Sequence, residues 1–564
     1  MKNLNLKPML NAYPDSLGGT LADVAAFLEY PEVKGAFASI YILPSLFNTD
    51  LDRGFSVIDY GLDQTLATRE DLDRIQAEGI DLKLDFILNH ASVLSAPFQD
   101  ILQKGEDSEY RDFFIDWNKF WEGRGQMTEE GYIQPDEQYL KDMFTRKPGL
   151  PILMVRLPDG RDVPYWNTFY QEIRYSSVDA LDLVGKAGLQ YSVAKILEAR
   201  INAALAEGKK PAEIDLTEAG DAKAAVIDLL ESGRKYLGQM DLNIKSPKVW
   251  EHYDNTLKTL ASYGAKIVRL DAFAYAPKEP GERNFLNEPG TWQLLEKVRE
   301  LADKYGLTLL PEIHASYAEK TYELVASKGY MIYDFLLPGL IIDALERGSG
   351  EKLAAWAQEL LDKKMWAVNM LGCHDGIPML DLKGLVPDEQ IQSVIDTIVA
   401  RGGYIKNLHG KKDMYYQVNA TYFSALGEDP RKFLLARAMQ LFMPGKPQVW
   451  YLDLFAGRND HEAVRRAGPG GHKEINRTNL SREQMRDGMR SELFRKQIEL
   501  LRMRSGCAAF HPEAKIEVCC KADSVIKMSW DYAGVRAELT ADLSDLSMRV
   551  RVTEGEHISF SMDN

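Results

Sequence analysis

The chain has 564 residues, a formal net charge of −16 and a hydrophobic fraction of 45%, a composition that is typical of a folded protein and excludes a largely disordered one. The acidic balance argues against DNA or RNA as a partner, because nucleic-acid binding depends on clustered Lys and Arg. There is no apolar signal segment and no run of about 18 apolar residues, so we expect no membrane partner and a cytoplasmic location.

The first third of the chain begins with an alternation of strands and helices. Apolar β-branched residues predict strands at 37–44 and 81–88, and a helical period predicts a helix at 69–79 between them. The same βα rhythm resumes after residue 240 and ends near 447–456. This pattern is typical of buried parallel strands. About seven or eight strands are expected in total, which favours a (β/α)8 TIM barrel.

Two long segments interrupt this rhythm, and each follows the carboxyl end of a predicted strand. Within the first segment, two helical patterns at 189–208 and 219–238 predict a helical hairpin. Short alternating segments at the end of the chain predict a small antiparallel β-domain. The expected domains are a barrel (1–90, 240–375 and 428–506), an inserted domain B (91–239), an inserted loop domain B' (376–427) and a C-terminal β-domain (507–564).

Polar and titratable residues follow several of the predicted strands. Asn89 and His90 end one strand, and the others carry Arg269, Asp271 and Tyr275, then Glu312 and His314, then His374 and Asp375. A single Asp at a strand end is most often a helix cap or a turn residue. The whole set at successive strand ends instead favours a catalytic site, because barrels place their catalysts there.

Two of these carboxyl groups suit glycoside chemistry. Arg269 and Asp271 point to the same face of their strand, so we expect the guanidinium to keep Asp271 ionised as a nucleophile. Glu312 ends an apolar run, so burial is expected to raise its pKa, as a proton donor requires. A separation of about 5 to 5.5 Å would mean retention through a covalent intermediate, with Asp375 stabilising the positive transition state.

The motifs DFILNH, VRLDAFAY, PEIH and CHDG resemble the four signature regions of the α-amylase-type glycoside hydrolase clan. The resemblance implies that Asp271 is the nucleophile, Glu312 the acid/base and Asp375 the third catalytic acid. Within the clan, stretches such as AYPDSLGG, DRGFSVIDY, YDFLLP and EINR resemble the sucrose phosphorylase and sucrose 6'-phosphate phosphorylase family. That family implies that Asp52 and Arg477 form an ion pair that closes the pocket. It also implies a substrate-binding set made of Asp52, Phe55, His90, Phe169, Gln239, Arg269, Tyr275, His374 and Arg477.

The reaction implied is reversible phosphorolysis of an α-glucoside to α-glucose 1-phosphate, with inorganic phosphate as acceptor and without cofactor or metal. The expected acceptor residues are Arg146 and Lys147 in TRKPG, and Tyr416 and Gln417 in MYYQ. Adjacent cations resemble the sucrose 6'-phosphate enzymes, since extra positive charge can hold a second phosphate. The Tyr-Gln match tips the expectation slightly towards sucrose, with sucrose 6'-phosphate, glucosylglycerol and glucosylglycerate as alternatives.

In the same loop, Met414 replaces an acid that the family uses for fructose, and Asp413 lies one residue away.

Two rival functions stay open. A hydrolase or transglucosidase would keep the site and change the acceptor. A non-catalytic scaffold would have lost at least one carboxylate, and all three are present. The oligomeric state is also open, with a homodimer as one candidate.

Overall fold

The computed structural model describes residues 5–146, 149–407 and 415–564. The chain forms two compact units. The first comprises residues 1–89, 250–278 and 284–564, and the second comprises residues 90–249 and 279–283. Each unit is described by itself below. The finer four-part division expected from the sequence stays a prediction.

The first unit contains a parallel barrel, which confirms the fold expected from the βα rhythm. Parallel pairing runs through the eight strands in the order β14-β13-β5-β2-β1-β20-β16-β15, so most spatial neighbours are consecutive barrel strands, and the first strand, β1, pairs with the last, β20. The ladder ends at β14 and β15. The strands are β1 (Met9–Ala12), β2 (Ser39–Ile42), β5 (Asp81–Ile87), β13 (Ala265–Asp271), β14 (Thr308–Pro311), β15 (Ile332–Asp334), β16 (Ala367–Met370) and β20 (Gly445–Trp450).

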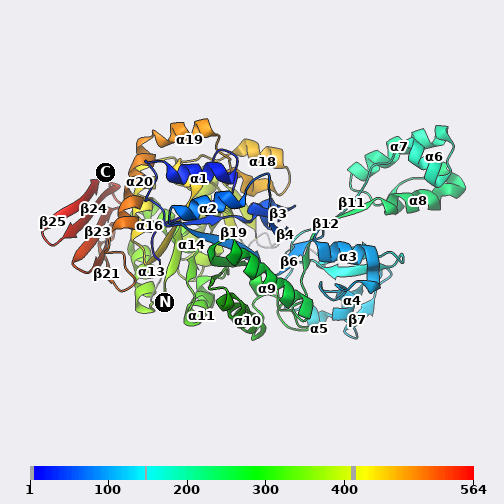
Figure 1. Ribbon diagram of the computed structural model, residues 1–564, viewed down its shortest axis with the longest axis horizontal. Coiled ribbons are helices and arrows are strands. Elements are labelled where there is room, and N and C mark those ends of the chain that lie inside the picture. The colour runs from blue at the N-terminus through cyan, green and yellow to red at the C-terminus, as the bar shows by residue number, and fades with distance from the viewer. Residues whose placement is uncertain (1–4, 147–148, 408–414) are drawn as a thin grey trace. The chain divides into compact units, whose positions relative to one another are not determined.

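Helices connect the barrel strands and cover their outer side (Figure 1). Several strands, such as β1, β2 and β16, are buried at every position, as expected for strands between a filled interior and a helical layer. Thr68 caps the second helix through a reciprocal capping box with Asp71. The main helices are α1 (Leu21–Glu29), α2 (Arg69–Ala77), α9 (Pro247–Ser262), α10 (Gly290–Lys304), α11 (Thr321–Ser327), α12 (Leu337–Arg347), α13 (Glu351–Asp362), α14 (Asp388–Ala400), α16 (Pro430–Phe442) and α20 (Glu492–Gly506).

A five-stranded antiparallel sheet ends the first unit, as the sequence predicts. Along its fourth strand, buried residues alternate with more exposed ones, so one face of the sheet is covered. Trp530 is fully buried on this covered side, and its indole N–H donates a hydrogen bond to the carbonyl oxygen of Phe442 in α16 at 2.8 Å. The strands are β21 (Lys515–Ala522), β22 (Val525–Tyr532), β23 (Val535–Asp542), β24 (Ser547–Glu554) and β25 (His557–Asp563).

The segment between β16 and α16 also adds a small sheet to the first unit. Its three strands pair antiparallel in the order β17-β19-β18. They are β17 (Ile377–Pro378), β18 (Tyr404–Asn407) and β19 (Tyr415–Asn419). This sheet follows Asp375 directly, so it continues the chain from a predicted site residue.

The second unit has two separate hydrophobic cores. Trp117, Trp121 and Trp166 form the centre of the first core. The hairpin of β9 (Ile152–Arg156) and β10 (Asp162–Trp166) contributes Trp166, and a second sheet has the order β11-β12-β6. Its strands are β6 (His90–Ser92), β11 (Gln171–Tyr175) and β12 (Arg234–Asp241), and the helix α3 (Ala96–Lys104) follows β6.

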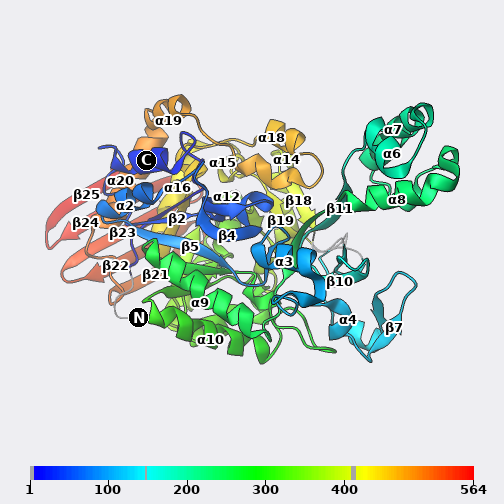
Figure 2. The same ribbon diagram turned by 45° about the vertical axis from the view of Figure 1, so that its right-hand side comes forward.

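The second core belongs to a helical bundle that begins and ends at the β11–β12 ribbon (Figure 2). The predicted hairpin is partly wrong. A third helix, α6 (Ala180–Ala187), joins α7 (Tyr191–Ala206) and α8 (Lys223–Ser232), and residues 234–238, expected to be helical, begin strand β12. The reason is tertiary pairing, because β12 bonds with β11 along one part and with β6 along the other.

Candidate active site

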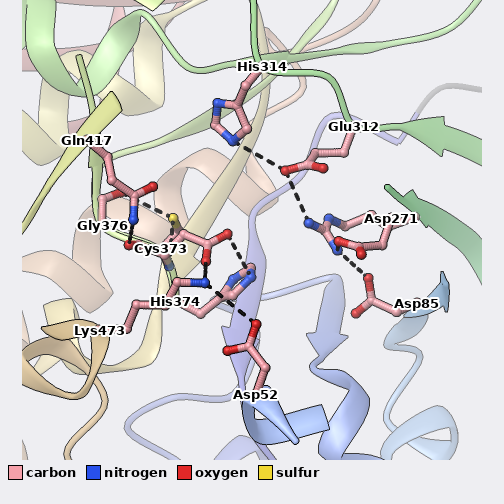
Figure 3. Close-up of polar contacts among 12 residues, drawn as sticks. Asp52, Asp85, Asp271, Glu312, His314, Cys373, His374, Gly376, Gln417 and Lys473 are labelled. Atoms are coloured by element: carbon pink, nitrogen blue, oxygen red, sulfur yellow. Dashed lines mark hydrogen bonds and ion pairs between the residues drawn. The ribbon is translucent and has the colours of Figure 1, made fainter. Parts of the chain in front are cut away.

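One buried guanidinium links the acidic residues at the ends of three barrel strands. Arg269, in β13, lies with its Nη1 atom 2.6 Å from Asp85 Oδ1 and 2.9 Å from Asp271 Oδ1. Its Nη2 atom lies 3.3 Å from Glu312 Oε1. Asp271 is the last residue of β13, and Glu312 directly follows β14. Figure 3 shows the side chains of Asp85, Asp271 and Glu312 close together.

The pKa values of the Asp271 and Glu312 pair are in the reverse order to the sequence expectation. Burial raises the pKa of Asp271 to about 7, against the lowering effect of Arg269. Burial also raises the pKa of Glu312, but Arg269 and His314 outweigh it and bring this pKa down to about 2. The expectation was wrong because it assumed that Arg269 contacts Asp271 alone. It did not include the second cation, which lies beside Glu312.

That second cation is His314. Its Nε2 atom lies 3.3 Å from Glu312 Oε1, and its Nδ1 atom lies 3.3 Å from Asp381 Oδ2. The imidazole also stacks on the ring of Phe335, with 3.8 Å between the ring centres. Burial lowers the pKa of His314, but the two carboxylates raise it to about 10. A protonated His314 therefore holds Glu312 in its charged form.

The third acid, Asp375, lies between an imidazole and an ammonium group. Its Oδ2 atom is 3.2 Å from His374 Nε2, and its Oδ1 atom is 2.5 Å from Lys473 Nζ. Burial raises the pKa of Asp375, but His374 and Lys473 together leave it well below its ordinary value. Asp375 is therefore a carboxylate at neutral pH.

The predicted ion pair between Asp52 and Arg477 is a loose contact in this structure. Arg477 Nη1 lies 3.9 Å from Asp52 Oδ1, and Arg477 Nε donates a hydrogen bond to the His374 carbonyl oxygen at 2.8 Å. Asp52 and Arg53 both have a left-handed backbone, with φ of 48° and 50°. Non-glycine residues in this region carry strain, which is common at ligand sites.

Contacts are defined for several predicted pocket residues of the first unit. The ring of Phe55 stacks on His374 with 5.1 Å between centres, and Tyr275 lies 4.6 Å from Phe285 by the same measure. Gln417 donates a hydrogen bond from its side chain to the Asp375 carbonyl oxygen at 2.6 Å. A pocket at this edge is lined by residues that include Arg269, Glu312, His314, His374, Asp375 and Gln417.

Among the described residues, four predicted site residues lie in the second unit. The His90 ring is 4.8 Å from the Phe169 ring, and the Arg146 guanidinium carbon lies 4.7 Å from the centre of the same ring. Gln239 is buried in β12 and pairs with Ser92 of β6. The structure thus brings His90, Phe169 and Arg146 together within this unit.

Part of the expected acceptor site lies outside the described residues. This applies to Lys147, and to Asp413 and Met414 of the loop before β19. Tyr416 is described only through its backbone in β19, where Gln417 pairs with Lys406 and Pro378.

Sequence reasoning missed three charged residues of the site. Asp85 lies inside the DFILNH motif and contacts Arg269, while Asp381 contacts His314 from a short 3-10 helix, η8 (Leu380–Leu382). Lys473 contacts Asp375 from another, η9 (Gly471–Asn476). The sequence feature that could have indicated Lys473 is its position four residues before Arg477, which is a predicted site residue.

The described residues contain neither a metal-binding group nor a membrane-spanning helix. Within residues 5–146, 149–407 and 415–564, no group of three or more His, Cys, Asp or Glu side chains is arranged to hold a metal ion. In the same part of the chain, no helix combines the length and apolar character needed to cross a bilayer.

A parallel barrel with three acids at or beyond the ends of its fourth, fifth and seventh strands, β13, β14 and β16, defines a carbohydrate-active enzyme of the α-amylase type. The family model for the alpha amylase catalytic domain matches residues 11–146. A sucrose 6(F)-phosphate phosphorylase from Ilumatobacter coccineus is 47% identical over 545 residues, covering 95% of this chain and 94% of the relative. The chain belongs to the sucrose phosphorylase and sucrose 6'-phosphate phosphorylase family, and it is a glucoside phosphorylase of the glycosyltransferase type.

Two further comparisons agree with this assignment. A sucrose phosphorylase from Streptococcus mutans is 29% identical, over 98% of this chain and 99% of the relative. The crystal structure of sucrose 6F-phosphate phosphorylase from Thermoanaerobacter thermosaccharolyticum superposes with a TM-score of 0.80 at 30% identity. That match covers 99% of this chain and 98% of the other.

Proposed function

We propose that the chain transfers the glucosyl group of sucrose 6'-phosphate to inorganic phosphate with retention, giving α-glucose 1-phosphate and fructose 6-phosphate. The observation that carries this proposal is the 47% identity to a sucrose 6(F)-phosphate phosphorylase, against 29% for the sucrose phosphorylase from Streptococcus mutans. The Tyr-Gln match in the sequence favoured sucrose slightly, but it rests on two residues, whereas the identity extends over 545.

In the proposed mechanism, Asp271 attacks the anomeric carbon while Glu312 protonates the departing fructosyl oxygen. Phosphate then attacks the glucosyl–Asp271 intermediate from the same side as the departed sugar, which restores the α-configuration. Both carboxyl groups contact the same guanidinium, at 2.9 and 3.3 Å, and this keeps them at close range. Asp375 is the nearby carboxylate that balances the positive charge of the transition state.

The proton inventory of the pair supports this mechanism. With pKa values of about 7 for Asp271 and about 2 for Glu312, the two groups share one proton between these pH limits. The mechanism needs one proton on this pair, because one group must be an ionised nucleophile and the other a protonated acid. The mechanism requires this proton on Glu312 when the leaving group departs.

The acceptor side is supported by the cation Arg146, whose guanidinium lies over Phe169. A departing sugar with its own phosphate needs positive charge in addition to that used for inorganic phosphate. We expect Arg146→Ala to weaken use of sucrose 6'-phosphate more than use of sucrose, by about 1.5 to 3 kcal/mol. Arg174→Ala is the matched control, because Arg174 is an exposed arginine of the same unit, paired with Glu172.

The decisive assay incubates the enzyme with sucrose or sucrose 6'-phosphate, with and without inorganic phosphate, and measures glucose and glucose 1-phosphate. The proposal expects glucose 1-phosphate, more efficiently from sucrose 6'-phosphate. A higher kcat/KM for sucrose would favour sucrose phosphorolysis, the second candidate, which the Tyr416 and Gln417 match supports. Free glucose that is independent of phosphate would instead indicate a hydrolase.

One further outcome would test the proposed substrate without testing the assignment to the family. If neither sugar is cleaved, while glucose 1-phosphate still reacts with glycerol, glycerate or another hydroxyl compound, the substrate proposed here is wrong. The assignment to the phosphorylase family would be unaffected by that result.

A further inference from the structure

Lys473 is a charged residue of the site to which neither the sequence motifs nor the proposed mechanism gives a role. It lies in η9, four residues before Arg477. Its ammonium nitrogen is 2.5 Å from Asp375 Oδ1 and 3.9 Å from Asp52 Oδ2 (Figure 3). Its side chain is only 20% exposed, so the charge is directed inward and is not a solvated surface lysine.

The contacts of Lys473 bridge the two carboxylates that Arg477 reaches only loosely. Arg477 lies 3.9 Å from Asp52 and 4.0 Å from Asp375, whereas Lys473 makes the close contact to Asp375. Both oxygens of Asp375 are thus held, one by Lys473 and the other by His374 at 3.2 Å. An ammonium group at this distance fixes the orientation of a carboxylate and favours its charged form.

The same geometry leaves other polar atoms available to a ligand. Among the described residues, the Nη2 atom of Arg477 and the Nδ1 atom of His374 are buried without a hydrogen-bond partner. Buried polar atoms of this kind are normally satisfied, so a polar ligand is expected to bind them. Lys473 therefore holds one carboxylate in place beside donors and acceptors that are open to sugar hydroxyls.

We propose that Lys473 is a positioning residue of the glucosyl pocket, which fixes Asp375 for sugar binding and adds one positive charge to the pocket wall. This inference rests on the proposed function, because it takes the pocket around Asp375 as the glucosyl site. Lys473 acts through Asp375 and Asp52, so it is not itself a catalytic residue.

The added charge gives the proposal a signature that a structural role lacks. A neutral sugar donates hydroxyl hydrogen bonds to Asp375, so a less firmly held carboxylate binds it more weakly. A cationic sugar analogue also loses those bonds, but it gains from removal of a like charge in a partly buried site. Replacing Lys473 by a neutral residue must therefore change the ratio of the two affinities.

The experiment measures binding of glucose and of the cationic iminosugar 1-deoxynojirimycin by titration calorimetry. The proteins are the full-length wild type and the variants Lys473→Met, Lys473→Gln and Lys473→Arg. Lys496→Met is the matched control, because Lys496 is also paired with one carboxylate, that of Glu492, but on the outer helix α20. If the Met variant fails to fold, the Gln variant carries the same comparison.

We expect Lys473→Met to weaken glucose binding about tenfold and to shift the affinity ratio towards the iminosugar by about tenfold, as loss of one nearby charge predicts. Lys473→Arg should restore most of both effects, and Lys496→Met should change neither. An unchanged ratio, with both ligands weakened equally or not at all, would overturn the inference. A wild type that binds neither ligand would instead contradict the proposed glucosyl site, and the inference with it.

Discussion

Arg269 contacts three carboxyl groups, those of Asp85, Asp271 and Glu312, and a single guanidinium cannot balance three negative charges. His314 supplies a second cation, but only on the side of Glu312. Burial raises the pKa of Asp271 to about 7, and the neighbouring carboxylates of Glu312 and Asp85 add to that rise against the lowering effect of Arg269. The positions of the cations, more than burial alone, decide which carboxyl group holds the proton that Asp271 and Glu312 share.

The three candidate catalytic acids, Asp271, Glu312 and Asp375, could be predicted from the sequence because each lies at or just beyond the end of an apolar run. Asp381 and Lys473 could not be predicted in this way, since they reach the site from short 3-10 helices with no such pattern. The pKa order of Asp271 and Glu312 was wrong for the same reason. It depends on His314, whose charge is maintained by Asp381 from 67 residues further along the chain.

Glu312→Gln separates proton donation from nucleophilic attack. We expect kcat on sucrose or its phosphate ester to fall about 10²- to 10⁴-fold, because these leaving groups need a proton. Turnover of α-glucosyl fluoride should change little, since fluoride leaves unprotonated. Steady-state kinetics with both donors provides the measurement, and Asp271→Asn, which removes the nucleophile, should lose activity on both. Equal losses on both donors in the Gln variant would exclude the acid role of Glu312.

The pH dependence follows from the proton shared by Asp271 and Glu312. As the pH rises through about 7, the pair loses that proton and no acid is left for the leaving group. We therefore expect kcat/KM for the sugar donor to fall on the alkaline side of about pH 7. The profile for α-glucosyl fluoride should lack this fall, because an ionised pair still contains the nucleophile. Identical alkaline limbs for the two donors would contradict this assignment of the proton.

The helical bundle within residues 176–233 shows what local patterns can and cannot predict. The sequence predicted the helices α7 and α8, but the predicted helical segment continued into 234–238, which is a strand. Strand pairing decided the outcome there, since β6 lies more than 140 residues away in sequence from its partner residues in β12. The helix α6, with eight residues, was not predicted.

The bundle has its own buried core, with Leu183, Leu197, Ile201 and Leu230 all fully buried. Its two ends are adjacent, because the Ser176 N–H donates a hydrogen bond to the Gly233 carbonyl oxygen at 2.9 Å. We therefore expect that residues 177–232 can be replaced by Asn-Gly, a pair that suits a tight hairpin turn between β11 and β12. The main thermal transition should stay within about 4 °C of the wild type, measured by calorimetry.

Two results would count against this independence. Aggregation of the shortened protein would mean that the bundle covers apolar surface outside its own core. A main transition lowered well beyond the expected range would mean that the bundle stabilises the rest of the chain. Leu197→Ala in the full-length protein is the comparison variant, because it opens a cavity in the bundle core without changing the chain connections.

At the scale of the whole molecule, the C-terminal sheet is joined to the barrel through the buried Trp530 of β22. Its indole N–H donates a hydrogen bond to the Phe442 carbonyl oxygen at the end of α16, and the guanidinium of Arg504 in α20 lies 5.2 Å from its ring. Arg504 also donates to Leu441 and Gly445 at 2.8 and 3.0 Å. Gly445 is the first residue of β20. The sequence predicted both the barrel and the sheet from their periodicities, but these contacts depend on side chains at a tertiary interface and carry no local signal.

The junction can be tested through Trp530, which is fully buried and lies 5.3 Å from Phe510, measured between ring centres. Trp530→Ala should lower the free energy of unfolding by about 3 to 5 kcal/mol, because it leaves a large cavity. Trp530→Phe keeps most of the packing and leaves the Phe442 carbonyl unsatisfied, so it should cost about 1 to 3 kcal/mol. Urea unfolding followed by circular dichroism measures both. If the sheet and the barrel depend on this contact, Trp530→Ala shifts a single unfolding transition to lower urea concentration. A separate early unfolding transition for the sheet, with that of the barrel unchanged, would show that the two fold independently.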